Sequence, residues 1–131
     1  NKQLGEIVEI GNLPDSYTVN KIIESNSNYI KIEINQSSNI KELLANVPGG
    51  STIVYVEIIV HEMFNSLNST ISIGTEYNNE KYMKINENNL YFAAKYAISF
   101  ENKIYTDEEI NVYFNRGSAT NGTAFVTVAW N

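Results

Sequence analysis

Hydrophobic and polar residues alternate along much of the chain, with the period of two that is typical of a half-buried β-strand. In Tyr29–Asn35, three isoleucines alternate with Lys31 and Glu33. Runs of Val, Ile, Thr and aromatic residues, bounded by turn-forming residues, predict further strands. These runs are Tyr17–Glu24, Ile53–Phe64, Thr70–Gly74, Tyr91–Phe100, Lys103–Thr106, Ile110–Phe114 and Thr123–Trp130.

The longest apolar run, Ile53–Phe64, follows the chain breaker Pro48-Gly49-Gly50 and is apolar on both of its faces. A strand with two apolar faces is covered on both. We expect one face in the core and the other against a neighbouring subunit, or against a helix or N-terminal arm of the same chain. The expected core face is Val54, Val56, Ile58 and Val60. The expected interface is Ile53, Tyr55, Ile59 and His61, with Glu57 among them, and the two sets can be exchanged.

One segment, Ser37–Val47, has a helical pattern. Its four large apolar residues, Ile40, Leu43, Leu44 and Val47, fall on one face at helical spacing. Asn39 is a good N-cap, Glu42 completes a capping box, and Pro48 stops the helix. We expect a short helix that closes one end of a sheet structure.

About eight strands and one short helix predict an all-β fold, an antiparallel β-sandwich of the jelly-roll kind. A chain of 131 residues is long enough for one domain with its own core. We expect residues 1–36 to form N-terminal strands or an arm, within the same domain or docked on it. We expect residues 37–131 to form the sandwich module. Because the first residue is Asn rather than Met, we expect either processing or a longer parent protein.

Composition excludes several classes of function. The net charge of −6 argues against a nucleic-acid partner. The absence of cysteine removes disulfides and thiolate chemistry, and a single histidine excludes a multi-histidine metal site. No apolar run reaches membrane-spanning length and no signal peptide is visible. We expect no membrane insertion, no metal and no cofactor.

Catalytic motifs are incomplete. His61-Glu62 begins like a zinc-protease motif, but Asn65 occupies the position of the second histidine. Asp107-Glu108-Glu109 lacks the further oxygen ligands of a calcium site and is typical of a solvated charged turn. No pair of carboxylates is placed for acid–base catalysis. We therefore expect no catalytic residues and a protein that is not an enzyme.

Aromatic residues offer a binding role, since nine tyrosines and one tryptophan occur in the chain. Aromatic rings stack on the apolar faces of sugars, and tyrosine adds a polar group. Most of these aromatics lie in alternating strands, where they fill a core or an interface. Tyr77, Tyr82 and Tyr91 flank the irregular 76–90 segment, and we expect them to be exposed candidate glycan contacts.

Several short motifs from Ile40 to the C-terminus occur in a distinctive order. They are Pro48-Gly49-Gly50-Ser51, a long Val/Ile strand ending in Phe64-Asn65, Ile71-Ser72-Ile73-Gly74, Asn88-Asn89-Leu90, and finally Gly117–Val128, a glycine-threonine loop that leads into the last strand. This order resembles the small C-terminal β-sandwich modules of tailed-bacteriophage virion proteins, such as head fibres, tail fibres and collar or decoration proteins. The resemblance covers about two-thirds of the chain and involves no catalytic signature.

The resemblance implies a homotrimeric, non-enzymatic module on a virion surface, in contact with other virion proteins and with host surface glycans. It implies roles in assembly and host attachment. A strand with two apolar faces supports a partner subunit independently. The alternative hypothesis is a monomeric carbohydrate-binding β-sandwich that works through exposed tyrosines or Trp130.

Overall fold

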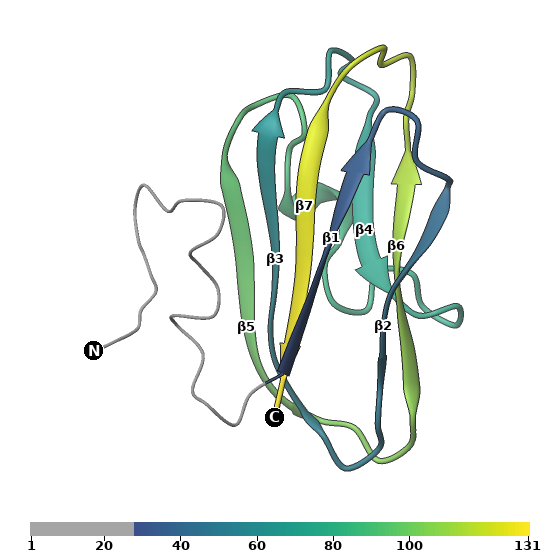
Figure 1. The fold of residues 1–131 in the computed structure, drawn as a ribbon, viewed down its shortest axis with the longest axis vertical. Helices are drawn as coiled ribbons and strands as arrows, with labels where there is room; N and C mark the ends of the chain where they lie inside the picture. The colour runs from purple at the N-terminus through teal and green to yellow at the C-terminus, as the bar shows by residue number, and fades with distance from the viewer. Residues whose placement is uncertain (1–27) are drawn as a thin grey trace, which may run out of the picture.

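A computed structural model describes residues 28–131 as a sandwich of two antiparallel sheets. The elements are β1 (Asn28–Asn35), β2 (Lys41–Val47), β3 (Thr52–Glu62), β4 (Thr70–Gly74), a 3₁₀ turn η2 (Ile85–Glu87), β5 (Lys95–Lys103), β6 (Glu108–Asn115) and β7 (Thr123–Trp130). One sheet has the order β1-β7-β3-β5 and the other β2-β6-β4 (Figure 1). The predicted all-β antiparallel sandwich is confirmed, with seven strands in the described part of the chain.

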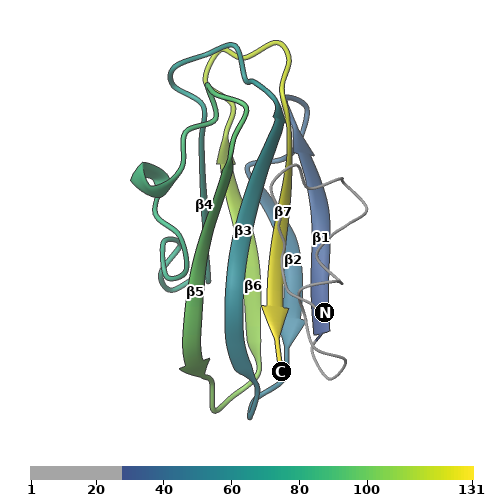
Figure 2. The same cartoon turned by 90° about the vertical axis from the view of Figure 1, so that its left-hand side faces the viewer.

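The core lies between the two sheets. In Figure 2, β5, β3, β7 and β1 stand side by side, with β4, β6 and β2 behind them. Alternate side chains of each strand point into this layer and are almost completely buried. They include Val56, Ile58 and Val60 of β3, Val126 and Val128 of β7, Ile110 and Val112 of β6, and Ile71 and Ile73 of β4. Burial of this set supplies the main stabilisation of the fold.

The helix predicted over Ser37–Val47 is wrong, because the segment forms β2 and pairs antiparallel with β6. The capping contact does form, since the Asn39 N–H donates to Glu42 Oε2 at 2.8 Å, but it closes a turn that leads into a strand. Ile40 and Leu43 are exposed rather than buried on a helical face. A β-bulge between Leu43 and Ala45 lets the adjacent Leu44 and Ala45 both be buried. Pairing with β6 therefore overrides the local helical pattern.

The central strand β3 contains a second bulge, between Ile53 and Tyr55, which shifts its register against both neighbours. Ile53 is consequently fully buried in the core, while Val54 is only partly buried. The prediction for Val56, Ile58 and Val60 is confirmed. The placement of Val54 in the core and of Ile53 outside it is wrong, because a bulge inserts one residue and reverses the alternation before it.

The stretch between β4 and β5 closes one open side of the sandwich. Met83 forms a bridge to Ile73 of β4, and Tyr82 packs edge-to-face on Phe100 of β5, with 5.5 Å between ring centroids. This stretch carries η2 and is otherwise irregular. Of the strand predicted at Tyr91–Phe100, the part from Lys95 belongs to β5, which continues to Lys103. The separate strand predicted at Lys103–Thr106 is wrong, because residues 104–107 form the turn that leads into β6. The last strand has the predicted bounds.

Two further observations concern the chain ends and membranes. β1 belongs to the four-stranded sheet, where Asn28 lies opposite Trp130. The strand predicted at Tyr17–Glu24 and the N-terminal arm lie outside the described residues. Among residues 28–131 there is no helix with the length and apolarity needed to cross a membrane.

Candidate interaction surfaces

The outer face of the four-stranded sheet carries the residues that the sequence places opposite the core. Three cross-strand rows lie in register across β7, β3 and β5. They are Ala129–Tyr55–Ser99, Thr127–Glu57–Ala97 and Phe125–Ile59–Lys95. Tyr55, Glu57 and Ile59 occupy alternate positions of β3 and so share this face. His61 lies beyond a register shift, and its ring lies against Phe125 of the same face. Ile53 does not share this face, because it lies in the core.

The middle of this outer face is buried although it points away from the core. Glu57 is 3% exposed and its neighbour Thr127 is 1% exposed. Glu57 Oε2 pairs with Lys95 Nζ at 3.2 Å, while Oε1 has no hydrogen-bond partner. A buried carboxylate with one free oxygen is costly unless a further group compensates it. We name the set Tyr55, Glu57, Thr127 and Ala129 the buried outer patch.

Two hydroxyl groups of the buried outer patch are also unpaired. Tyr55 Oη and Thr127 Oγ1 are buried and have no hydrogen-bond partner. Burial is the main cause that raises the pKa of the Tyr55 phenol above its ordinary value, and the charges of Glu57 and Tyr29 raise it further. The phenol is therefore protonated and available as a donor at neutral pH. Three of the buried polar atoms without a protein partner therefore lie on this one face.

The same face is more open toward the C-terminal end of β3. Ile59 and Phe125 are partly exposed, and His61 is exposed. The His61 ring lies edge-on to Phe125 with centroids 6.1 Å apart, and Lys31 Nζ lies 5.2 Å from the centre of the Phe125 ring. We name Ile59, His61 and Phe125 the open outer patch. It combines aromatic, aliphatic and basic groups, as protein interfaces commonly do.

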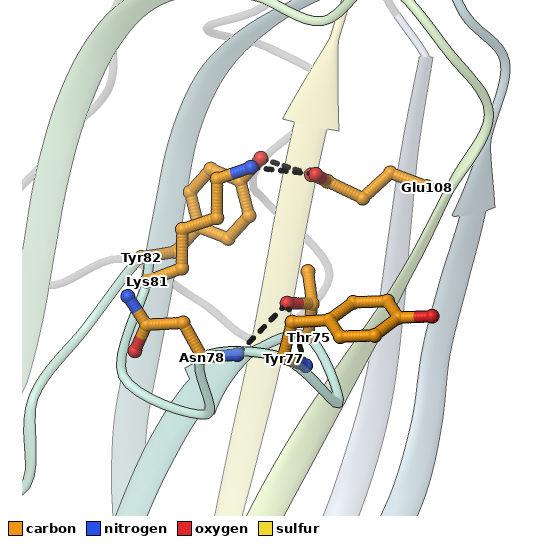
Figure 3. A network of polar contacts seen from close by, with 6 residues as sticks. All are labelled: Thr75, Tyr77, Asn78, Lys81, Tyr82 and Glu108. Atoms are coloured by element: carbon orange, nitrogen blue, oxygen red, sulfur yellow. Dashed lines mark hydrogen bonds and ion pairs between the residues drawn. The ribbon is translucent and has the colours of Figure 1, made fainter.

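A second surface is a polar hollow of about 450 Å³ beside the loop after β4. It is lined by Thr75, Glu76, Tyr77, Asn78, Lys81 and residues 106–109. Figure 3 shows its ordered wall: Glu108 accepts hydrogen bonds from Lys81 Nζ, at 2.6 Å, and from the Tyr82 hydroxyl. Thr75 Oγ1 accepts the N–H groups of Tyr77 and Asn78 at 3.3 and 3.2 Å. These contacts fix the loop that carries Tyr77.

The three candidate glycan contacts differ in exposure. Tyr77 is 93% exposed at the rim of the polar hollow, and Tyr91 is exposed beside Phe92. Tyr82 is only 3% exposed, so its predicted exposure is wrong. The aromatic side chain of Tyr82 fills the side of the sandwich, and burial together with the hydrogen bond to Glu108 raises its phenol pKa. Tyr82 is therefore a packing residue.

The two segments that the sequence offers as incomplete metal-binding motifs, His61-Glu62 and Asp107-Glu108-Glu109, form no metal site in the described part of the chain. His61 and Glu62 are both exposed near the end of β3. Asp107 Oδ1 accepts the N–H of Gly49 at 2.8 Å and so joins two loops. Among residues 28–131, no three His, Asp or Glu side chains gather in a way that would hold a metal ion.

Comparison with known proteins extends the fold assignment. No family model and no curated protein matches the chain. Among solved structures, a chain of the cyanophage Pam1 capsid asymmetric unit is similar with a TM-score of 0.60 and 11% identity, covering 80% of this chain and 84% of that one. A chain of the acid-stable capsid of Helicobacter pylori bacteriophage KHP30 is similar with a TM-score of 0.56 and 13% identity, covering 82% and 89%.

These similarities define a class of fold. The chain has the antiparallel β-sandwich that is also found in components of two phage capsids, and the likeness extends over nearly the whole of each chain compared. At such low identity, the fold is the property that the similarity establishes. It does not transfer individual interface residues.

Proposed function

We propose that this protein is a non-enzymatic structural component of a bacteriophage virion. The observation that carries the proposal is the shared β-sandwich in two phage capsids, which spans at least 80% of every chain compared. The order of short motifs from Ile40 onward independently resembles virion modules of tailed phages. Its activity is assembly with other virion proteins rather than catalysis.

Mass spectrometry of purified virions of the phage that encodes the chain tests this role. The protein should be recovered as a component present in many copies per particle. Virions that are complete and infectious without the protein would contradict the proposal. Electron microscopy of particles grown with and without the gene then distinguishes a capsid component from a fibre component.

We further propose that the protein assembles as a homotrimer through the open outer patch. Ile59 and His61 lie at this patch, and the apolar surface of Ile59 and Phe125 remains accessible at the end of the sheet. Burial of apolar and aromatic groups against another copy stabilises such an assembly. Ile53 takes no part because it belongs to the core. Tyr55 borders the interface with its ring, since its hydroxyl is already buried.

The mass of the full chain in solution tests the trimer. Light scattering after gel filtration should give about three times the 14.8 kDa chain mass. Ile59→Asp should give a folded monomer, because it places a charge in the interface. Ser99→Asp is the matched control, since Ser99 is exposed on the adjacent strand of the same face. A wild-type monomer at micromolar concentration contradicts the trimer.

A role in host-surface adhesion has one supporting observation, the exposed ring of Tyr77 at the rim of the polar hollow. Tyrosine can stack on a sugar face while Asn78 and neighbouring carboxylates bind hydroxyl groups. The excess of carboxylates around the hollow favours neutral over acidic sugars. Glycan-array binding that is lost in Tyr77→Ala and kept in Tyr91→Ala would support adhesion at this site. Binding that neither substitution reduces contradicts it.

A further inference from the structure

Two loops at one end of the sandwich are tied together around a single Asn-Gly step. One loop joins β3 to β4 and the other joins β6 to β7, and both lie at the upper end in Figure 1. Asn121-Gly122 belongs to the second loop, and it is the only place in the sequence where asparagine precedes glycine. Asn121 is exposed to water, whereas Gly122 is buried.

An Asn-Gly step rearranges without an enzyme, because glycine leaves the amide nitrogen that follows asparagine unhindered. The main-chain nitrogen of Gly122 attacks Cγ of the Asn121 side chain. The side-chain amide leaves as ammonia, taking up the proton of the Gly122 amide, and a succinimide ring forms. Water then adds to either ring carbonyl and opens the ring to aspartate or isoaspartate. The net reaction consumes one water, releases one ammonia and replaces a neutral amide by a carboxyl group.

The contacts of the loop oppose this rearrangement. Ring closure requires the peptide between Asn121 and Gly122 to rotate. The carbonyl of Asn121 accepts the N–H of Asn65 at 3.4 Å, and the N–H of Asn121 donates to Asn65 Oδ1 at 3.3 Å. Asn65 is itself held by Thr120, whose N–H and hydroxyl both bind its side chain at 2.8 Å. Gly122 lies so close to the ring of Phe64 that not even a Cβ atom fits between them.

We propose that Asn121-Gly122 is a site of succinimide formation, and that Asn65 protects it by holding the main chain of Asn121. The step then reacts only when the contact between the two loops opens, so the rate of deamidation follows the local stability of this end of the sandwich. This proposal does not depend on the function or on the trimer.

The isoaspartate product does not fit the native loop. Isoaspartate adds one carbon to the main chain directly before Gly122, where the ring of Phe64 leaves no free space. The loop cannot restore its contacts with Asn65 once the main chain is longer. The rearrangement therefore makes a local opening permanent and exposes the end of the core beside Phe64.

Incubation of the full chain at mildly alkaline pH, followed by peptide mass spectrometry, tests the protection. The fraction of Asn121 converted to aspartate and isoaspartate is measured with time, in buffer and in urea. The folded chain should react at least roughly tenfold more slowly than the unfolded chain, because the loop contact has to open first. Equal rates in buffer and urea would overturn the proposal.

Substitutions of Asn65 test its role as the protecting residue. Asn65→Ala should speed the reaction of the folded chain roughly fivefold or more and leave the rate in urea unchanged. Asn65→Asp keeps the acceptor for the Asn121 N–H and should react almost as slowly as the native chain. Ser72→Ala is the control for a general loss of stability, since it removes a hydrogen bond to the Asn79 carbonyl in a different loop. A rate that Asn65→Ala leaves unchanged, or that Ser72→Ala raises equally, overturns the assignment to Asn65.

Asn121→Gln tests what the modification does to the fold. The contacts with Asn65 use the main chain of residue 121, and so this variant should fold with native stability. A glutamine side chain closes a larger ring, which forms more slowly. After long incubation, urea unfolding of the native chain should show a second, less stable population that Asn121→Gln lacks. An equal loss of stability in the incubated variant would overturn the link between this step and the opening of the core.

Discussion

Gly122 lies directly against the ring of Phe64, so closely that a Cβ atom at position 122 would overlap the ring carbons. Gly122 has a φ of +146°, which L-residues rarely adopt. Phe64 has no room to retreat, because it is fully buried and packs edge-on against Phe114 with 5.6 Å between centroids. The loop before β7 can therefore pack against the end of the core only because Gly122 has no side chain.

Gly122→Ala should destabilise the protein by about 2–5 kcal/mol, because it adds backbone strain to a steric overlap in a packed core. Urea unfolding of the full chain measures the loss. Gly50→Ala is the matched control: its φ is +91°, but a Cβ there meets nothing within 4 Å. This control should cost only about 1–2 kcal/mol, the strain alone. Equal losses in the two variants would show that the Phe64 ring moves aside.

Alkaline pH should unfold the protein through its two buried phenols. Burial raises the pKa of both Tyr55 and Tyr82 above the ordinary value of 10. Above about pH 10 the unfolded chain loses these protons while the native chain keeps them, so the unfolded state binds fewer protons. The contribution of the two phenols to the free energy of unfolding should be constant below pH 10 and then fall by about 1.4 kcal/mol per pH unit for each tyrosine.

Tyr82→Phe separates the two contributions to this pH dependence. Removal of one phenol should reduce the slope above pH 10 by about 1.4 kcal/mol per pH unit, as measured by urea unfolding at a series of pH values. The variant also loses the hydrogen bond to Glu108 and should be somewhat less stable at pH 7. An unchanged slope would indicate that Tyr82 ionises as easily in the folded as in the unfolded chain.

Asn65 joins two loops at one end of the sandwich. Its Oδ1 accepts the N–H groups of Thr120, at 2.8 Å, and Asn121, at 3.3 Å, and its Nδ2 donates to Thr120 Oγ1 at 2.8 Å. Asn65→Ala should cost about 1 kcal/mol or more and speed amide exchange at Thr120 and Asn121. Asn65→Asp keeps the acceptor, so amide protection at these residues should largely persist. Equal exchange in both variants would assign the loop contact to other groups.

Ile58 and Ile59 are adjacent in β3 but point to opposite faces of the sheet. Ile58 is fully buried in the core, and Ile59 is partly exposed on the outer face. Ile58→Asp should cost at least about 4 kcal/mol by leaving a carboxylate unpaired in the core, and should prevent folding. Ile59→Asp should remain folded by circular dichroism. A soluble, cooperatively folded Ile58→Asp protein would contradict the assignment of the core face.

Much of the fold follows from alternation alone. The pattern in Thr123–Trp130 predicts β7 with its observed bounds, and Thr70–Gly74 predicts β4. These strands are short, regular and bounded by turn residues, so the local signal agrees with the tertiary pairing. The prediction for the β2 segment is wrong because the adjacent pair Leu43-Leu44 fits the apolar face of a helix and not the alternation of a strand. In the structure a bulge makes this adjacency compatible with a strand, and only the partner strand β6 determines that bulge.

The surfaces are harder to predict than the strands. The alternation in β3 places Tyr55, Ile59 and His61 on one face, but the bulge that removes Ile53 from it has no local signature. Tyr82 looks exposed in a charged, irregular stretch, and its burial depends on Phe100 and Glu108, which are distant in sequence. Thr127 reads as an ordinary outward polar residue. Its near-complete burial beside Glu57 is visible only in the paired sheet.

The position of β7 has a consequence for how the protein is made. Among the described strands β7 is the last to be synthesised, yet it lies between β1 and β3, with both of which it is paired. Until it emerges from the ribosome, the nascent chain presents two unpaired strand edges and an open core. The growing chain is therefore open to edge-to-edge association until β7 has been made. A premature stop in this strand would leave an aggregation-prone product rather than a shortened sandwich.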